Sequence, residues 1–389
     1  MSGTSMDGID LALIETDGEN KIKRGANMSV AYDAAFRERL GRALQDAAVM
    51  TSAEERPGNL APVERELTRK HAEAVTRFLN IRHLLKTDIS ILGFHGQTVL
   101  HRPDDKLTVQ LGLGEDLANR TGIETAYDFR AADVAAGGQG APLVPVYHHA
   151  LVKSAGLELP VVIVNLGGVG NVTYIGEGGD DGEKGSELLA FDTGPGNALI
   201  DDWLMQHTGQ PMDRDGEIAA KGTLSEPVLS ELFDNPYFSS LPPKSLDRNE
   251  FSLSPLKGMS LEDGAKTLTA FTAHSLARAV SHFPMPPKTW IISGGGTNNP
   301  TLMTELAKQL KGNVIRADAV TSAITSGGSE ASDCCNLHST TSGWSSEFME
   351  AEAFAYLAVR AKLGLPITFP TTTGVKAPMT GGRIASVNL

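Results

Sequence analysis

The chain is predicted to adopt an α/β fold in which ligand-binding loops follow the ends of strands. Short β-like runs alternate with helical stripes along the sequence, as is typical of α/β architectures. Glycine-rich segments adjoin these runs at 3–8, 165–171, 192–197 and 293–296. Glycine lets backbone N–H groups approach a bound anion closely, so loops of this kind indicate a large anionic ligand.

Length and composition agree with a soluble globular protein. The chain has 389 residues, of which 41% are hydrophobic and 21% charged, enough for two domains. Its net charge of −13 argues against nucleic-acid or anionic-membrane partners, which require basic patches. We find neither a run of about eighteen apolar residues nor a basic-then-apolar N-terminus, and therefore expect a cytoplasmic protein. Cys334 and Cys335 are expected to be free thiols.

The helical stripes are predicted to be core faces. The first stripe is Phe36, Leu40, Leu44 and Ala47. The second is Val63, Leu67, Ala74, Val75 and Phe78, ahead of a strand at 89–94. Further helices are expected at 266–280, before a strand at 290–292, and at 350–363.

Two lobes are expected. The first comprises residues 1–130 and is completed by 365–389, and the second comprises 131–364. Gly/Pro-rich stretches at 137–145 and 364–370 leave two candidate crossings between the lobes.

The first loop has the composition of a phosphate-binding turn. Glycines allow close backbone approach, hydroxyls add donors, and a carboxylate can hold Mg²⁺ directly or through water. Its candidate phosphate-binding residues are Gly3, Thr4, Ser5, Met6, Asp7, Gly8, Ile9 and Asp10. An ordinary turn before the apolar run 11–14 is the alternative, which the other glycine-rich loops disfavour.

Two later loops extend the phosphate site. Asn165, Gly167 and Gly168 lie between apolar runs at 161–164 and 172–175, and Gly294, Gly295 and Gly296 follow the strand at 290–292. Neither a GxxxxGK[ST] loop nor a GxGxxG fingerprint occurs. Because the first two loops share a layout, the chain resembles the actin, hexokinase and Hsp70 superfamily. That resemblance implies a two-lobed, ribonuclease-H-like kinase fold with a central cleft.

Motifs along nearly the whole chain narrow this resemblance. They are GTSMDGID, GFHGQTVLHRP, YDFRAADVAAGGQGAPLVP, NLGGVGNVTYI, FDTGPGNALIDDW, MDRDGEIAAKG, ISGGGTNNP and MEAEAFAYLA. In this order they are similar to those of anhydro-N-acetylmuramic acid kinases. The resemblance implies an ATP- and Mg²⁺-dependent enzyme of peptidoglycan recycling, a homodimer, that converts 1,6-anhydro-N-acetylmuramic acid to N-acetylmuramic acid 6-phosphate.

The resemblance makes Asp192 the candidate general base. In this family the base activates water, which attacks the anomeric carbon while the bridge oxygen accepts the γ-phosphoryl group. Asp192 follows a strand and precedes Thr193–Asn197, so it should project from a rigid element. The alternative is a helix cap, but Asn197 is better placed for that role.

Other polar residues are candidates for binding the metal ion and the sugar. Asp7 and Glu350 are the expected Mg²⁺ ligands, the family motif favouring Glu350 over Glu352. His95, Gln97 and Thr98 follow a buried-type strand and could contact the sugar, although a core histidine is an equal alternative for His95. Asp128 and Arg130 form the candidate sugar clamp, in which Arg130 matches the lactyl carboxylate, with a structural Asp–Arg pair as the alternative.

Some alternatives and segments stay open. A kinase for another anhydrosugar such as levoglucosan, or a sugar and ATP sensor on the same fold, would share most of these motifs. Asp213, Arg214 and Asp215 fit the family without an assigned role. The aperiodic stretch 321–342 is expected to be a mobile surface loop. The resemblance also implies a strand ahead of the first loop, which would hold Asp7 rigid.

Overall fold

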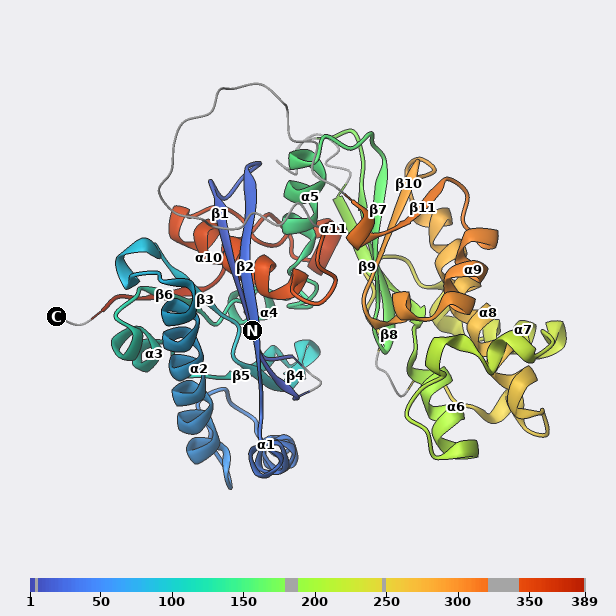
Figure 1. The fold of residues 1–389 in the computed structure, drawn as a ribbon, viewed down its shortest axis with the longest axis horizontal. Coiled ribbons are helices and arrows are strands. Elements are labelled where there is room, and N and C mark those ends of the chain that lie inside the picture. The colour runs from blue at the N-terminus through green and yellow to red at the C-terminus, as the bar shows by residue number, and fades with distance from the viewer. Residues whose placement is uncertain (4–5, 179–187, 247–249, 321–342, 388–389) are drawn as a thin grey trace. The chain divides into compact units, whose positions relative to one another are not determined.

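A computed structural model describes residues 1–3, 6–178, 188–246, 250–320 and 343–387. The chain divides into two compact units (Figure 1). Among the described residues, unit 1 holds 1–155 and 347–387, and unit 2 holds 156–320 and 343–346. This division differs from the expected lobes, because residues 131–155 and 347–364 belong to unit 1. The stretch 321–342, with Cys334 and Cys335, lies outside the described residues.

Unit 1 combines small sheets with helices. Its strands are β1 (Gly8–Thr16), β2 (Ile22–Ala31), β3 (Leu92–Phe94), β4 (Gln97–Arg102), β5 (Leu107–Leu111), β6 (Thr125–Tyr127) and β12 (Arg383–Ala385). Its helices are α1 (Ala34–Ala47), α2 (Leu60–Arg82), α3 (Gly114–Thr121), α4 (Ala131–Ala135), α5 (Pro145–Ser154), α10 (Met349–Leu363) and α11 (Pro370–Thr373). Hairpins β1–β2 and β4–β5 accompany a three-stranded sheet in the order β12-β6-β3.

The predicted stripes form the core of unit 1. Asp33 caps α1 by accepting a hydrogen bond from the Phe36 N–H, and Phe36 and Leu40 are fully buried. They pack in one cluster with Leu60 and Leu67 of α2. The sequence prediction of these two helices is therefore confirmed.

Helix α10 explains why the C-terminal segment joins unit 1. It packs against β1, β3 and β6, and in Figure 1 its red ribbon lies beside the blue β1–β2 hairpin. A Cβ atom on Gly93 of β3 would lie 2.1 Å from the Phe354 carbonyl oxygen, so only glycine allows this approach. Helix α5 contacts both β2 and α10, which places 145–154 in unit 1 as well.

Unit 2 is built on one five-stranded sheet with the order β11-β10-β7-β8-β9. The strands are β7 (Val161–Leu166), β8 (Val169–Ile175), β9 (Leu188–Pro195), β10 (Thr289–Ser293) and β11 (Asn313–Arg316). The helices are α6 (Ala198–Thr208), α7 (Glu226–Phe233), α8 (Leu261–Ala279) and α9 (Pro300–Gln309). β7 and β10 are parallel, with Ser293 paired to Asn165, so the glycine-rich loops after these strands meet at one sheet edge.

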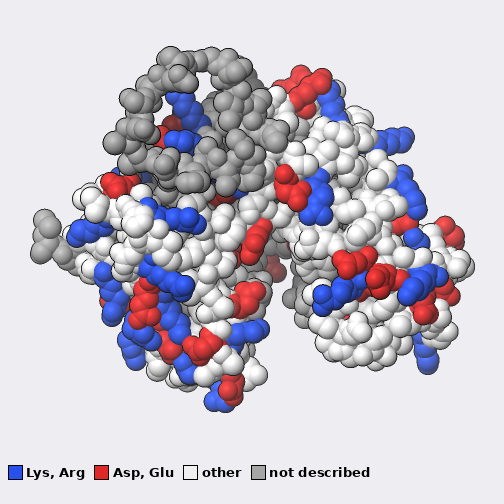
Figure 2. Space-filling model, viewed as in Figure 1, with Lys and Arg blue, Asp and Glu red and all other residues white. Residues whose placement is uncertain are grey.

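The α/β class predicted from the sequence is confirmed by these sheets and helices. The predicted strand at 89–94 is shorter than expected, since only Leu92–Phe94 pairs with β6. Acidic and basic side chains alternate over the face that carries α1 and α2 (Figure 2), where Arg39 pairs with Glu66 and Arg69 with Glu73. None of the described helices is both long and apolar enough to span a bilayer.

Candidate active site

Asp192 lies within strand β9 rather than after it. The strand continues to Pro195, and Asp192 pairs with Asn171 of β8. A bulge follows, because Gly170 pairs with Gly194 and leaves Thr193 as the extra residue. The expectation that a rigid element presents this carboxylate agrees with its position, but the end of the strand was placed too early in the sequence.

Among the described residues, a hydrogen bond reaches only one of the two Asp192 carboxylate oxygens. The Leu246 N–H donates to Oδ2 at 2.8 Å, and within the described chain Oδ1 has no hydrogen-bond partner. The Asp192 N–H donates to the Lys244 carbonyl oxygen at 3.0 Å, and the Tyr237 hydroxyl donates to the Asp192 carbonyl oxygen. These backbone contacts fix the residue against the 244–246 segment.

Burial raises the pKa of the Asp192 carboxyl to about 6, with the Leu246 N–H acting in the opposite direction. A carboxylate of this basicity accepts a proton more readily than an ordinary aspartate and is still ionised at neutral pH. Asp192 thus has the geometry and the basicity of a general base.

The β7–β8 hairpin binds the start of α6. The Gly167 carbonyl oxygen accepts a hydrogen bond from the Asn197 N–H at 2.8 Å, and the Gly168 carbonyl oxygen accepts from the Gly196 and Ala198 N–H groups. These three N–H groups are therefore already bonded within the protein. The contacts hold the hairpin against the start of α6.

The glycines of these loops fall into two groups. A Cβ atom on Gly294, whose φ is 84°, would lie 2.4 Å from Oδ1 of Asn165, and one on Gly296 would lie 2.7 Å from Cβ of Leu166. Close packing on β7 requires both of these glycines. A Cβ atom on Gly295 would meet no other atom within 4 Å, and those on Gly167 and Gly168 would meet only ordinary contacts at 3.7 Å. Packing among the described residues does not require these last three glycines.

Part of the first phosphate-binding loop belongs to strand β1. Gly8, Ile9 and Asp10 pair with β2, whereas the sequence placed the strand at 11–14. The Ile9 side chain is buried in the core, so it can offer a ligand only backbone groups. Gly8 is required by packing, because its Cβ atom would lie 2.7 Å from the Val30 carbonyl oxygen. Thr4 and Ser5 lie outside the described residues.

Backbone and side-chain hydrogen bonds hold the N-terminal loop in place. The Tyr32 N–H donates to the Asp7 carbonyl oxygen at 2.8 Å, and the Met6 N–H donates to the Gly3 carbonyl oxygen at 3.1 Å. Gln97 is buried, and its Oε1 accepts a 2.6 Å hydrogen bond from Ser2, which also accepts from the Tyr32 hydroxyl. In the structure Gln97 therefore supports the loop.

His95 and Arg130 contact each other. An Arg130 Nη2 atom lies 3.1 Å from Nε2 of His95, and Nδ1 of His95 lies 2.8 Å from the Gly96 carbonyl oxygen. Since the guanidinium can only donate, Nε2 accepts and Nδ1 carries the proton. Burial, followed by the Arg130 charge, holds the pKa of His95 well below its usual value. His95 is thus a neutral ring with both nitrogens bonded, which disfavours it as an alternative base.

Arg130 is positioned by a short hydrogen-bond chain. Its Nη1 donates to the Gly140 carbonyl oxygen at 2.7 Å, and the Gly140 N–H donates to Oδ1 of Asp133 at 2.6 Å. Asp133 is buried, and its other oxygen accepts from the Thr373 hydroxyl. The Arg130 Nε is buried and has no partner among the described atoms. The guanidinium is therefore fixed while still having donors for a ligand.

The acidic candidates of unit 1 differ in their surroundings. Glu352 is buried, pairs with Arg24 at 2.8 Å and accepts from the Tyr147 hydroxyl, so it is structural. Burial of the Glu350 carboxyl raises its pKa; the Arg130 charge opposes this shift and the Asp10 charge adds to it. Of the two glutamates, Glu350 therefore remains the candidate ligand for Mg²⁺, which prefers oxygen ligands.

Asp128, Thr98 and Asp7 complete the expected set in unit 1. Asp128 follows β6 with φ of 56°, and burial raises the pKa of its carboxyl while Arg383 opposes this. Thr98 is half-buried in β4, and its hydroxyl accepts a long hydrogen bond from Gln110. Asp7 is exposed beside β1. The described part of the chain contains no group of three His, Cys, Asp or Glu residues that could hold a metal.

Asp213 acquires a role that the sequence did not assign. It is buried, and its two oxygens accept hydrogen bonds from the Ile218 and Ala219 N–H groups at 3.0 Å each. The residue therefore holds a turn of unit 2. Asp215 follows in the left-handed region, with φ of 55°.

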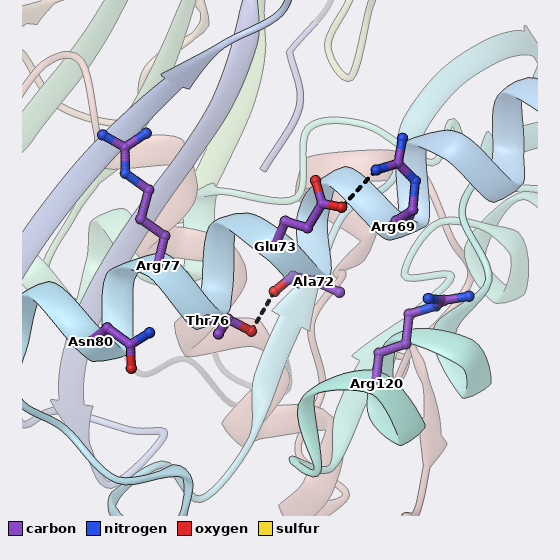
Figure 3. Close-up of a pocket in the computed structure, with 7 residues that line it drawn as sticks. All are labelled: Arg69, Ala72, Glu73, Thr76, Arg77, Asn80 and Arg120. Carbon is purple, nitrogen blue, oxygen red and sulfur yellow. Dashed lines mark hydrogen bonds and ion pairs between the residues drawn. The ribbon is translucent and has the colours of Figure 1, made fainter.

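A groove of about 570 Å³ on unit 1 is separate from these candidates. It lies along α2 and α3 and is lined by Arg69, Ala72, Glu73, Thr76, Arg77, Asn80 and Arg120 (Figure 3). None of the expected site residues lines it. Arg69 and Arg120 pair with Glu73 and Asp116 on their own helices, as solvent-exposed helix pairs do.

Known proteins resemble the chain along its length. The family model described as "Anhydro-N-acetylmuramic acid kinase" matches residues 1–386. The enzyme of that name from Methylobacterium nodulans is 49% identical over 99% of this chain and 98% of its own, and the one from Methylorubrum extorquens is 48% identical over 99% and 97%. Among solved structures, component A of the Acidaminococcus fermentans (R)-2-hydroxyglutaryl-CoA dehydratase is 11% identical, covering 90% of this chain and 98% of its own with a TM-score of 0.41.

Proposed function

Because the chain belongs to the anhydro-N-acetylmuramic acid kinase family, we propose that it opens the 1,6-anhydro ring of 1,6-anhydro-N-acetylmuramic acid and phosphorylates O6. The family membership rests on a match over residues 1–386 and on relatives nearly half identical over the whole chain. The product is N-acetylmuramic acid 6-phosphate, an intermediate of peptidoglycan recycling in this family. ATP is the phosphoryl donor.

Asp192 carries the chemistry of ring opening. Its Oδ1 takes a proton from water, whose oxygen forms a bond to the anomeric carbon. The bond between that carbon and the bridge oxygen breaks, and the bridge oxygen, now O6, forms a bond to the γ-phosphorus as ADP departs. The single observation that carries this assignment is a rigidly held carboxylate with one open oxygen and a pKa raised to about 6 by burial.

Backbone N–H groups and a cation neutralise the phosphates. In unit 2, the three glycines that packing does not require, Gly167, Gly168 and Gly295, support close approach of a phosphate chain. Asn165, Gly294 and Gly296 shape the same sheet edge. In unit 1, the loop 3–10 is the counterpart, with Gly3, Thr4, Ser5 and Gly8 as the candidate donors, because the Met6 N–H is bonded to the Gly3 carbonyl oxygen.

Mg²⁺ is the proposed cation, held by Asp7 and Glu350 with phosphate oxygens and water. The donors are oxygen atoms, as Mg²⁺ prefers, and a pair of carboxylates suffices for it. When bound, the ion would neutralise charge that builds up on the phosphates. Glu350→Gln should raise the Mg²⁺ concentration needed for half-maximal turnover, and an unchanged Mg²⁺ dependence would remove Glu350 from this role.

Arg130 is the proposed partner of the lactyl carboxylate, with His95, Asp128 and Thr98 nearby in the sugar-binding set. Two observations support this role. The guanidinium keeps N–H donors for a ligand, and the hydrogen bonds from Arg130 to Gly140 and from Gly140 to Asp133 hold it in place. A planar guanidinium matches a carboxylate with two parallel hydrogen bonds. Homodimerisation and a cytoplasmic location are proposed from the family alone.

A substrate panel tests the function. Purified full-length protein with Mg²⁺ and ATP is given 1,6-anhydro-N-acetylmuramic acid, its lactyl-free counterpart 1,6-anhydro-N-acetylglucosamine, and levoglucosan, and ADP and sugar phosphate are measured together. We expect turnover of the first sugar with one ADP per sugar phosphate. Preference for levoglucosan would reassign the substrate, and ATP turnover independent of any sugar would contradict the kinase function.

A further inference from the structure

Unit 2 contains a second cavity, on the flank of the strand that carries Asp192. It has a volume of about 320 Å³ and lies between β9 and the end of α8. Lining residues that bear on its chemistry are Phe191, Phe238, Lys244, Arg278, Ser281 and His282. Asp192 itself is not among the lining residues, so the cavity is distinct from the open Oδ1 atom of the proposed base.

Three basic side chains converge on this cavity without an acidic partner. Within the described chain, Lys244, Arg278 and His282 make no ion pair with a carboxylate, and the Lys244 Nζ donates only to the Tyr237 carbonyl oxygen at 3.1 Å. In a chain whose net charge is −13, such an uncompensated group is unusual. Burial lowers the pKa of Lys244, and burial followed by the Lys244 charge lowers that of His282. A bound anion would raise both pKa values again, because it stabilises the protonated forms of Lys244 and His282.

Aromatic rings hold these side chains in place and give the cavity an apolar wall. The Arg278 guanidinium lies 3.7 Å from the Phe233 ring centroid, and the Lys244 ammonium lies 4.5 Å from that of Tyr237. The His282 ring meets Phe191 edge-on at 5.4 Å. Stacked guanidinium groups lose less conformational entropy when their edge N–H groups bind a ligand.

We propose that this cavity binds a phosphate monoester dianion, whose phosphate contacts Lys244, Arg278 and His282 and whose body packs against Phe191 and Phe238. Two negative charges match three converging donors. The volume exceeds that of an inorganic phosphate and lies within the range of small-ligand pockets. The inference concerns binding and does not depend on the proposed kinase function.

The cavity shares one segment with Asp192. The side chain of Lys244 faces the cavity, while its carbonyl oxygen accepts the Asp192 N–H and the Leu246 N–H, two residues on, donates to the Asp192 carboxylate. Binding of the anion to Lys244 therefore alters the hydrogen bonds that hold the base, and turnover changes with occupancy.

The test uses full-length protein with a non-hydrolysable ATP analogue and Mg²⁺ to fill the nucleotide site. Glucose 6-phosphate and inorganic phosphate are titrated calorimetrically, and the His282 ring resonance, assigned with a His282→Gln variant, is followed by NMR. We expect saturable binding of glucose 6-phosphate, weaker binding of inorganic phosphate and a shift of the His282 resonance. Arg278→Gln and Lys244→Gln should each weaken binding about tenfold or more, the usual scale for a lost charge-assisted hydrogen bond.

Arg69→Gln, which removes an equal charge from unit 1, is the control and should bind as the unaltered protein does. Absence of saturable binding, or an equal loss in the control, would overturn the site. Inorganic phosphate binding as tightly as glucose 6-phosphate would overturn the role of the aromatic rings. In turnover, glucose 6-phosphate should change kcat of the unaltered enzyme but not of Arg278→Gln, and binding without any such change would overturn the link to Asp192. If the protein binds glucose 6-phosphate but turns over no anhydrosugar, the proposed kinase function is contradicted and the anion site is not.

Discussion

The backbone N–H of Leu246 donates a 2.8 Å hydrogen bond to Oδ2 of Asp192, and among the described residues no donor contacts Oδ1. The same segment accepts the Asp192 N–H through the Lys244 carbonyl oxygen. The orientation of the carboxylate is thus set by backbone from a part of the chain about fifty residues further on, which only the three-dimensional structure reveals.

The pKa of Asp192 predicts the acid limb of the pH profile. A general base must be ionised, and burial raises the pKa of this carboxyl to about 6. We expect kcat/KM to rise tenfold per pH unit below about pH 6 and to level off above it. A profile measured from pH 4.5 to 8 in buffers of equal ionic strength checks this. An acid limb centred near pH 4 would show that Asp192 has an ordinary pKa or is not the base.

Asp192→Asn should be inactive yet more stable. The amide oxygen can still accept the Leu246 N–H, but the side chain cannot take a proton, so kcat should fall roughly 10²-fold or more. Because the folded-state pKa is raised, ionisation of Asp192 destabilises the fold; this cost is absent at low pH, appears as pH rises from about 4 to 6, and is complete above 6.

Removing that cost should raise the free energy of unfolding at pH 7.5 by about 2–3 kcal/mol, since one pKa unit corresponds to about 1.4 kcal/mol. At pH 4 the two proteins should be equally stable, which makes the pH 4 comparison the internal control. Urea unfolding at both values measures the difference. If the variant is less stable than the parent at pH 7.5, the claim that ionisation of the buried Asp192 carboxyl destabilises the fold is contradicted.

Adjacent glycines separate packing from ligand binding. Gly294→Ala should destabilise unit 2 by about 2–4 kcal/mol, because its φ of 84° and ψ of 174° suit only glycine and its Cβ atom would lie 2.4 Å from Asn165. Gly295→Ala should leave the thermal midpoint within a degree or two of the parent but raise KM for ATP. Thermal unfolding and initial rates decide it. An unchanged KM in Gly295→Ala would remove this loop from the nucleotide site.

Arg130→Ala should weaken use of the lactyl sugar selectively. A lost charge-assisted contact costs about 1.5–3 kcal/mol, so kcat/KM for 1,6-anhydro-N-acetylmuramic acid should fall at least tenfold more than for its lactyl-free counterpart. Asp133→Asn, which disturbs the support of Arg130 through Gly140 and also the contact with Thr373, should give a smaller loss of the same selectivity. Equal losses for both sugars would make Arg130 structural.

Sequence reasoning identified the elements and loops but not the partners of each residue. Periodic stripes sufficed for α1 and α2, because one buried face dictates their pattern. The sequence could not show that Gly296 and Gly294 serve packing while Gly295 does not, since the difference depends on the neighbouring strand β7. Gly8, Ile9 and Asp10 are expected in a loop because small residues around a carboxylate are the composition of a phosphate-binding turn, whereas in the structure they pair with β2.

Long-range hydrogen bonds account for the other differences. Gln97 is expected to contact the sugar because polar residues after a buried strand often line a pocket; the structure adds that its Oε1 accepts a hydrogen bond from Ser2, 95 residues away in sequence. Asp213 remained without a role because its acceptors serve N–H groups of a turn that has no sequence signature. In contrast, the preference for Glu350 over Glu352 as a metal ligand, taken from the family motif, agrees with the buried ion pair of Glu352.

Turnover in ¹⁸O-labelled water tests the central claim most directly. If Asp192 activates water for attack at the anomeric carbon, one ¹⁸O atom enters the anomeric hydroxyl and none enters the phosphate or its bridge to O6. Because the anomeric oxygen of a free sugar exchanges slowly with water, the product must be analysed early in the reaction and compared with unlabelled N-acetylmuramic acid 6-phosphate incubated in the same water. Mass spectrometry with fragmentation locates the label. The account predicts full labelling at the anomeric carbon at the earliest time; label in the phosphoryl group, or sugar phosphate that has gained no solvent oxygen, would contradict it.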